Sequence, residues 1–189
     1  MKELTEEQAK ALQAYREVIP VKDGKSINVL LREEKTCKEV QILDEMMTIG
    51  NTPNVLFQPT TIPYVKTNII EENEVCFICD KAFLSTKNKI FSHEWVKVVE
   101  PAILIIDKCS NVPSIDIEGL LSETTDNHEF ILPRNIKLKI IGMERCNHNE
   151  SLEEFVTKHP QIIFDTPALR YTTPITIYKV EPIECVAEN

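Results

Sequence analysis

Apolar residues recur every three or four positions through the first fifty residues of the chain. The segment 4–15, "LTEEQAKALQAY", places its apolar side chains on one helical face, and Thr5 and Gln8 have the spacing of a capping box. The same period predicts a short helix over 26–33 and a longer one over 36–50, where a glycine ends the pattern. We therefore expect this N-terminal part to be helical.

The pattern changes to short apolar runs after residue 50. These runs are rich in β-branched and aromatic residues and are separated by Pro, Asn and Asp turns. In "NIKLKIIG", residues 135–142, isoleucine and leucine alternate with lysine, which is the period of a half-buried strand. One further helix is expected over 151–159. Similar apolar runs predict strands over 54–58, 74–79, 82–85, 102–107, 129–133 and 174–183.

Length and composition favour one domain. The chain has 189 residues, of which 42% are apolar and 27% charged, as in an ordinary globular protein that can bury a core. Helices first and strands afterwards predict an α+β fold with a mainly antiparallel sheet. We expect a single domain over 1–189, with a helical part over 1–50 and a β-rich core over 51–189. Four glycines in total exclude a Gly-rich phosphate loop.

Charge and cysteine usage narrow the range of partners. The net charge of -9, without a basic stripe, argues against a nucleic-acid partner. No apolar stretch approaches about 18 residues, and the N-terminus has no apolar signal region, so we expect no membrane association. The expected location is the cytoplasm, or a host cytoplasm after delivery. Cys76 and Cys79 have metal-like spacing, but the only other close pair is Cys146 with His148, so we expect buried thiols and no metal.

The order of the pieces carries a resemblance. Three helical segments come first, followed by "VLFQ", then "AFLSTKN", then "HEFILPRNIKLKIIG". This order is similar to that of the mono-ADP-ribosyltransferase family, above all its exoenzyme and phage branches, whose motifs run arginine, Ser-Thr-Ser and Glu-x-Glu. The resemblance covers 4–142 and includes the 44-residue separation of Ser85 from Glu129. It implies an ADP-ribosyltransferase-like fold, with N-terminal helices followed by a mainly antiparallel two-sheet core.

The resemblance also implies a reaction and its catalytic residues. The family uses NAD as a substrate and transfers ADP-ribose to a protein acceptor. Cleavage of the nicotinamide–ribose bond passes through an oxocarbenium-like transition state, which a fixed carboxylate stabilises. By resemblance that carboxylate is Glu129, Ser85 braces it, and Asn127 takes the acceptor-side position. An amide can form a hydrogen bond with a substrate but cannot act as a base, which makes arginine a less favoured acceptor.

The cofactor side of the expected site departs from the family pattern. Phe57 matches the motif aromatic residue, Gln58 falls on the motif arginine, and Ser85 with Thr86 matches the first two positions of Ser-Thr-Ser. A neutral amide cannot replace a bidentate cation on pyrophosphate, and losing such a bond costs about 1.5–3 kcal/mol. Lys66 is one candidate to supply the missing charge.

The leading hypothesis is an NAD-dependent mono-ADP-ribosyltransferase that modifies a protein acceptor, of a phage, viral or injected bacterial effector type. One alternative is a catalytically degenerate binding protein on the same fold, and another is an NAD glycohydrolase that uses water as acceptor. A third is a virion or other structural protein of mixed fold. The enzymatic hypotheses require Gln58, Ser85 and Glu129 to surround one crevice, whereas the structural alternative predicts Ser85 and Glu129 on unrelated surfaces.

Overall fold

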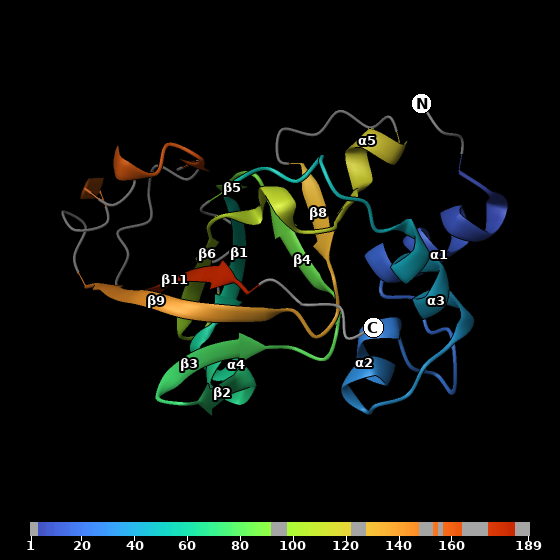
Figure 1. Cartoon of the computed structure of the whole chain (residues 1–189), viewed down its shortest axis with the longest axis horizontal. Helices are drawn as coiled ribbons and strands as arrows, with labels where there is room; N and C mark the ends of the chain where they lie inside the picture. The colour runs from blue at the N-terminus through green and yellow to red at the C-terminus, as the bar shows by residue number, and fades with distance from the viewer. Residues whose placement is uncertain are drawn as a thin grey trace.

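The computed structural model describes residues 4–91, 98–121, 128–147, 153–154, 157–163 and 174–183. It begins with three helices, which Figure 1 shows gathered on one side of a sheet, beside β4 and β8. These helices are α1 (Glu6–Arg16), α2 (Ile27–Arg32) and α3 (Lys38–Met46).

The start of α1 confirms the predicted capping box. The Thr5 side chain accepts the Gln8 N–H at 3.2 Å, and the Thr5 N–H donates to Gln8 Oε1 at 3.0 Å. The end of α3 differs from the prediction, because this helix ends at Met46 rather than at the glycine of the pattern. The reason is a backbone pairing: the Thr48 N–H donates to the Ser114 carbonyl at 3.0 Å and the Ser114 N–H donates back at 2.9 Å.

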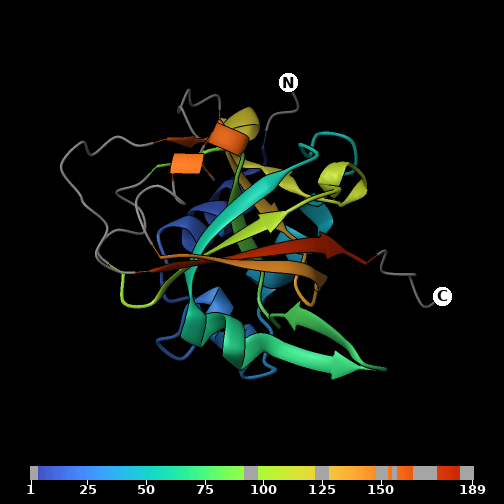
Figure 2. The ribbon, with the colours of Figure 1, turned by 90° about the vertical axis from the view of Figure 1, so that its left-hand side faces the viewer.

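The described part of the chain contains a nine-stranded sheet with the order β2-β3-β9-β11-β6-β1-β4-β8-β7. Its neighbours are antiparallel except β6 and β11, and a separate pair, β5 with β10, is also parallel. Figure 2 shows the twist of the large sheet, with α4 and the β2–β3 hairpin at one edge. The strands are β1 (Leu56–Thr61), β2 (Ile69–Glu72), β3 (Val75–Cys79), β4 (Leu84–Lys87), β5 (Ile90–Phe91), β6 (Pro101–Ile106), β7 (Ile115–Asp116), β8 (Glu129–Leu132), β9 (Lys137–Cys146), β10 (Ile162–Ile163) and β11 (Ile175–Pro182).

The structure confirms the predicted α+β class and its mainly antiparallel sheet, although the two sheets are very unequal in size. The predicted helix over 151–159 is helical at 153–154 and 157–158, and its other residues up to 156 lie outside the described part. The prediction missed two short helices, α4 (Ile62–Asn68) and α5 (Ile117–Leu121). No helix among the described residues has the length and apolarity needed to cross a membrane.

Alternation along β8 sends its side chains into two different packing clusters. Ile131 is fully buried against the helices, together with Phe83 and the α1 residue Leu12. Phe130 instead packs on the opposite face, in the cluster that contains Leu104 of β6. Because residues two apart in a strand share a face, Glu129 lies on the same side as Ile131, toward the helices.

Candidate active site

Ser85 and Glu129 meet on the helix-facing side of the sheet. Ser85 pairs with Ile131 across the β4–β8 ladder, so Glu129 is its diagonal neighbour on the same face. The Ser85 hydroxyl donates to Glu129 Oε1 at 2.5 Å, and both residues are half-buried. This length is that of a charge-assisted bond between a hydroxyl and a carboxylate. The structure therefore joins two residues that are 44 positions apart in sequence.

The backbone of Glu129 is held separately from its side chain. Its N–H donates to Glu118 Oε2 at 2.6 Å, and Glu118 is only 4% exposed. Lys87 lies directly opposite Glu129 in the ladder, which places a cationic residue in the same row on the same face. The catalytic carboxylate predicted from the sequence thus has its oxygen, its backbone and its strand neighbour all fixed by the fold.

Tyr15 of α1 packs on the helix-facing side of the sheet, in the same cluster as Phe83. Its ring packs edge-on against Phe83 with the centroids 6.0 Å apart, and its hydroxyl donates to the Phe83 carbonyl at 3.5 Å. Burial raises the pKa of Tyr15 far above its ordinary value, the nearby Asn28 side chain opposes this, and the Glu129 carboxylate adds to the increase. Arg32 also acts on this hydroxyl, in the opposite direction to Glu129. Tyr15 is therefore a neutral phenol within electrostatic reach of both groups.

Arg32 is anchored on a buried carboxylate. Its Nε donates to Asp80 Oδ1 at 3.1 Å and its Nη2 to Oδ2 at 2.6 Å, while the Arg32 side chain stays 48% exposed. Asp80 also accepts the Tyr64 hydroxyl at 2.9 Å and the Ala82 N–H at 3.0 Å. Burial acts to raise the pKa of the Asp80 carboxyl, but the Arg32 bonds and the other two donors outweigh it and hold the pKa below its ordinary value.

Gln58 belongs to this second group rather than to the Ser85–Glu129 pair. Burial and the Asp80 carboxylate raise the pKa of Tyr64, and the neighbouring Gln58 amide acts against them. Gln58 Oε1 is buried without a hydrogen-bond partner among the described residues. Phe57 pairs with Lys87 on the neighbouring strand, and Lys87 pairs with Glu129 on the next. The Phe57 side chain therefore lies on the same face of the sheet as Glu129. Gln58 projects from the other face of its strand. The expectation that Gln58, Ser85 and Glu129 surround one crevice is therefore wrong for Gln58, and of these three residues the structure brings together Ser85 and Glu129.

The remaining predicted site residues are not placed for direct contact with a ligand, or lie outside the described residues. Phe57 is fully buried in a cluster with Ile103 of β6. Thr86 is also fully buried, and its hydroxyl donates to the Phe130 carbonyl at 3.0 Å. Both residues therefore support neighbouring strands. Asn127 falls in the segment 122–127, outside the described residues.

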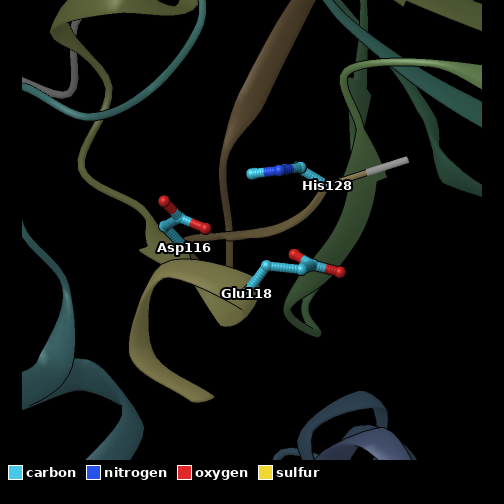
Figure 3. Close-up of side chains that lie close together, drawn as sticks. All are labelled: Asp116, Glu118 and His128. Carbon is cyan, nitrogen blue, oxygen red and sulfur yellow. The ribbon is translucent and has the colours of Figure 1, made fainter. Parts of the chain in front are cut away.

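A third group of polar side chains lies next to Glu129. Asp116, Glu118 and His128 each offer a ligand atom, and these atoms all lie within 4.8 Å of one another. Figure 3 shows their side chains near one another, from the end of β7, the start of α5 and the residue before β8. Carboxylates and an imidazole are ligand types that a divalent cation accepts. In this fold Glu118 already binds the Glu129 N–H, and Asp116 Oδ1 accepts the Gly119 N–H at 3.0 Å.

Sequence reasoning missed Tyr15, Arg32, Asp80 and Glu118 as parts of the site. The helical period over 4–15 identifies Tyr15 only as an apolar position. The Arg32–Asp80 pair joins residues 48 positions apart, and the Glu118–Glu129 bond depends on the burial of a charged residue. One local signal could have identified Glu118, namely an acidic residue within the otherwise apolar segment "IEGLL".

Comparison with known proteins gives a result at the level of structure. No protein-family model matches the chain, and no curated protein matches it significantly. Among solved structures, the ATR domain of Salmonella SpvB is 16% identical with a TM-score of 0.57, over 95% of this chain and 100% of that domain. Plx2a, an ADP-ribosyltransferase toxin from Paenibacillus larvae, is 15% identical with a TM-score of 0.59, over 95% of this chain and 87% of that one.

A longer protein gives the same result. The enzymatic component C2-I of the C2 toxin from Clostridium botulinum is 15% identical with a TM-score of 0.60, and the match covers 96% of this chain but 44% of C2-I. At such identities the similarity establishes the arrangement of helices and strands and leaves activity to be argued from the site. Together with the element order described above, these matches show that the chain has the fold of the ADP-ribosyltransferase toxins.

Proposed function

We propose that this protein is an NAD-dependent mono-ADP-ribosyltransferase that modifies a protein acceptor and acts as one domain over 1–189. The observation that carries the proposal is the 2.5 Å hydrogen bond from Ser85 to Glu129 on the helix-facing side of the sheet. The shared fold with ADP-ribosyltransferase toxins supports the reaction class.

Glu129 is the proposed transition-state carboxylate. When the bond between ribose C1′ and the nicotinamide nitrogen breaks, its electron pair leaves with nicotinamide and positive charge builds on the sugar. A carboxylate fixed beforehand stabilises that charge without having to reorganise. The bond from Ser85 fixes Oε1, and in this proposal Oε2 faces the ribose. The acceptor nucleophile then bonds to C1′ and loses its proton.

Arg32 is the proposed source of positive charge for the pyrophosphate, in place of the missing motif arginine. Its guanidinium is half exposed, and Asp80 holds it in a bidentate orientation. The charges of Glu129 and Arg32 both act on the pKa of Tyr15, in opposite directions, so Tyr15 lies near both groups. Phe57 and Thr86, which are fully buried, keep a supporting role, and Gln58 contributes through Tyr64.

Asn127 is the proposed acceptor-side residue. An amide at this position can orient an acceptor through hydrogen bonds but cannot remove its proton. The same observation favours a second candidate function, NAD glycohydrolysis, in which water takes the place of the protein acceptor. The two functions share Ser85 and Glu129 and differ only in the group that attacks C1′.

The test combines NAD-induced thermal stabilisation with nicotinamide release, for the wild type and Glu129→Ala. Because Glu129 acts in the transition state, we expect its loss to lower release by about a hundredfold or more and to leave the stabilisation in place. Glu144→Ala, an exposed acid on β9, is the matched control and should release nicotinamide like the wild type. Neither stabilisation nor release in the wild type would favour the degenerate binding protein.

NAD labelled on its adenylate half separates the two candidate functions. Transfer of label to protein, in an extract that supplies acceptors, supports the transferase. If no protein is labelled and nicotinamide is released at the same rate with and without the extract, the glycohydrolase is supported.

A further inference from the structure

Glu118 is a buried carboxylate that the chemistry proposed above does not use. It lies in α5, is 4% exposed, and accepts the backbone N–H of Glu129 at 2.6 Å. Burying a carboxylate is unfavourable unless it is well hydrogen-bonded. Its position against the backbone of one particular residue, the proposed catalytic one, therefore calls for a functional explanation.

The Glu118–Glu129 bond closes the segment between β7 and β8 at its base. The two strands are antiparallel neighbours, with Asp116 paired to Phe130, and the bond joins residues 11 positions apart. A hydrogen bond holds the start of α5 at the other side of this closure. Asp116 Oδ1 accepts the Gly119 N–H at 3.0 Å, and a Cβ on Gly119 would lie 2.5 Å from Asp116 Oδ2, so a larger residue there would require this carboxylate to shift.

The closure fixes the point at which β8 begins. The peptide unit between His128 and Glu129 is bound on both sides. Its carbonyl, that of His128, accepts the Asn88 N–H at 3.1 Å, and its N–H, that of Glu129, donates to the Glu118 side chain. Figure 3 shows Glu118 and His128 close together at this strand end. The Glu129 side chain then extends from a restrained backbone to Ser85. A restraint of this kind matters because catalytic groups must be held to within about 0.5 Å of their working geometry.

We infer that Glu118 is a positioning residue of the transferase site: its carboxylate holds the backbone of Glu129 so that the Glu129 side chain stays on Ser85. This inference rests on the proposed function, since it concerns the orientation of the catalytic carboxylate. Glu118 acts through Glu129 and does not touch NAD.

Two substitutions at this position separate the role of the acceptor oxygen from simple packing. Glu118→Gln keeps an oxygen that can accept the Glu129 N–H, whereas Glu118→Ala removes it. The readouts are kcat and KM for nicotinamide release, and hydrogen exchange of the Glu129 amide followed by NMR. Thr52→Val is the matched control, because it breaks buried hydrogen bonds to Ser114 and Val112 just before β7 without any contact to Glu129.

We expect Glu118→Ala to lower kcat by about tenfold or more, to leave the KM for NAD within about twofold, and to expose the Glu129 amide to exchange. Glu118→Gln should stay within about threefold of wild-type kcat with the amide still protected. Thr52→Val should lower the melting temperature while kcat and the Glu129 amide protection stay at wild-type values.

Three results would overturn the positioning role. The first is a wild-type kcat in Glu118→Ala although the Glu129 amide exchanges freely. The second is an equal fall of kcat in Glu118→Gln and Glu118→Ala. The third is an equal fall of kcat in Thr52→Val, which would indicate general destabilisation. A wild type that releases no nicotinamide would reject the proposed function, and the positioning role with it. Amide protection would still report whether the bond exists, so the two failures are distinguishable.

Discussion

Ser85→Ala removes the hydroxyl that holds Glu129 Oε1, and it leaves the strand and the carboxylate in place. The lost bond is 2.5 Å long and has a charged acceptor, a type worth about 1.5–3 kcal/mol. Both residues are half-buried, so water can replace part of the interaction and the lower end of this range applies. We therefore expect kcat for nicotinamide release to fall by about tenfold.

The assay is steady-state nicotinamide release over a range of NAD concentrations. Because the bond orients a group that acts on the transition state, the KM for NAD should change by less than about twofold. Ser114→Ala is the matched serine control. Ser114 is 1% exposed, and its Oγ lies 2.7 Å from Thr52 Oγ1, so its loss should cost about 1 kcal/mol of stability and leave kcat unchanged.

A double-mutant cycle decides whether Ser85 acts through Glu129. In the Glu129→Ala background the hydroxyl has no carboxylate to hold, so adding Ser85→Ala should have no further effect on the rate. A wild-type kcat in Ser85→Ala, or a further tenfold loss in the double mutant, would refute the reasoning.

Three other predictions follow from the groups around this pair. Arg32→Ala should raise the KM for NAD by about tenfold, and Arg32→Lys, which keeps the charge but loses the bidentate geometry, should raise it less. Steady-state kinetics and isothermal titration with NAD measure the KM and the Kd, and equal values for the wild type and both variants would reject Arg32 as the pyrophosphate ligand. Thr86→Val should lower the free energy of unfolding in urea by about 0.5–1.5 kcal/mol, because it removes the buried hydrogen bond from the Thr86 hydroxyl to the Phe130 carbonyl; an unchanged midpoint would contradict this. The folded-state pKa of Asp80 lies below its ordinary value, so its contribution to stability is present above pH ~4 and is lost as the pH falls through the folded pKa. Urea unfolding at a series of acidic pH values should therefore show a shallower loss of stability in Asp80→Asn than in the wild type, and parallel curves would count against the shift.

Sequence patterns predicted the parts of the fold that depend on local preference. Helical periodicity and the Thr5 capping box were enough to locate α1, and alternation was enough to locate β9, because both signals lie within a few consecutive residues. α4 was missed because β1 continues directly into it: Thr61 ends the strand and also caps the helix by accepting the Tyr64 N–H. The helix is short and its first turn contains a proline, so its sequence resembles a turn.

The site was predictable only where a family resemblance supplied long-range information. Ser85 and Glu129 were paired in advance on that basis, and the structure joins them. The face on which Gln58 lies depends on the register of β1 against β4 and β6, which no local pattern contains. The Arg32–Asp80 pair likewise needs the packed positions of α2 and the loop before β4. Tertiary pairing, rather than propensity, determines these contacts.

Asp80 connects three separate segments of the chain, since Arg32 of α2 and Tyr64 of α4 both bind its Oδ2 and the Ala82 N–H binds its Oδ1. Asp80 engages Nε and Nη2 of Arg32, which leaves other N–H groups of the guanidinium for an anion. An anion bound there would share the Arg32 charge with Asp80, so ligand occupancy near α2 should register as a change in the environment of the Tyr64 hydroxyl on a different helix.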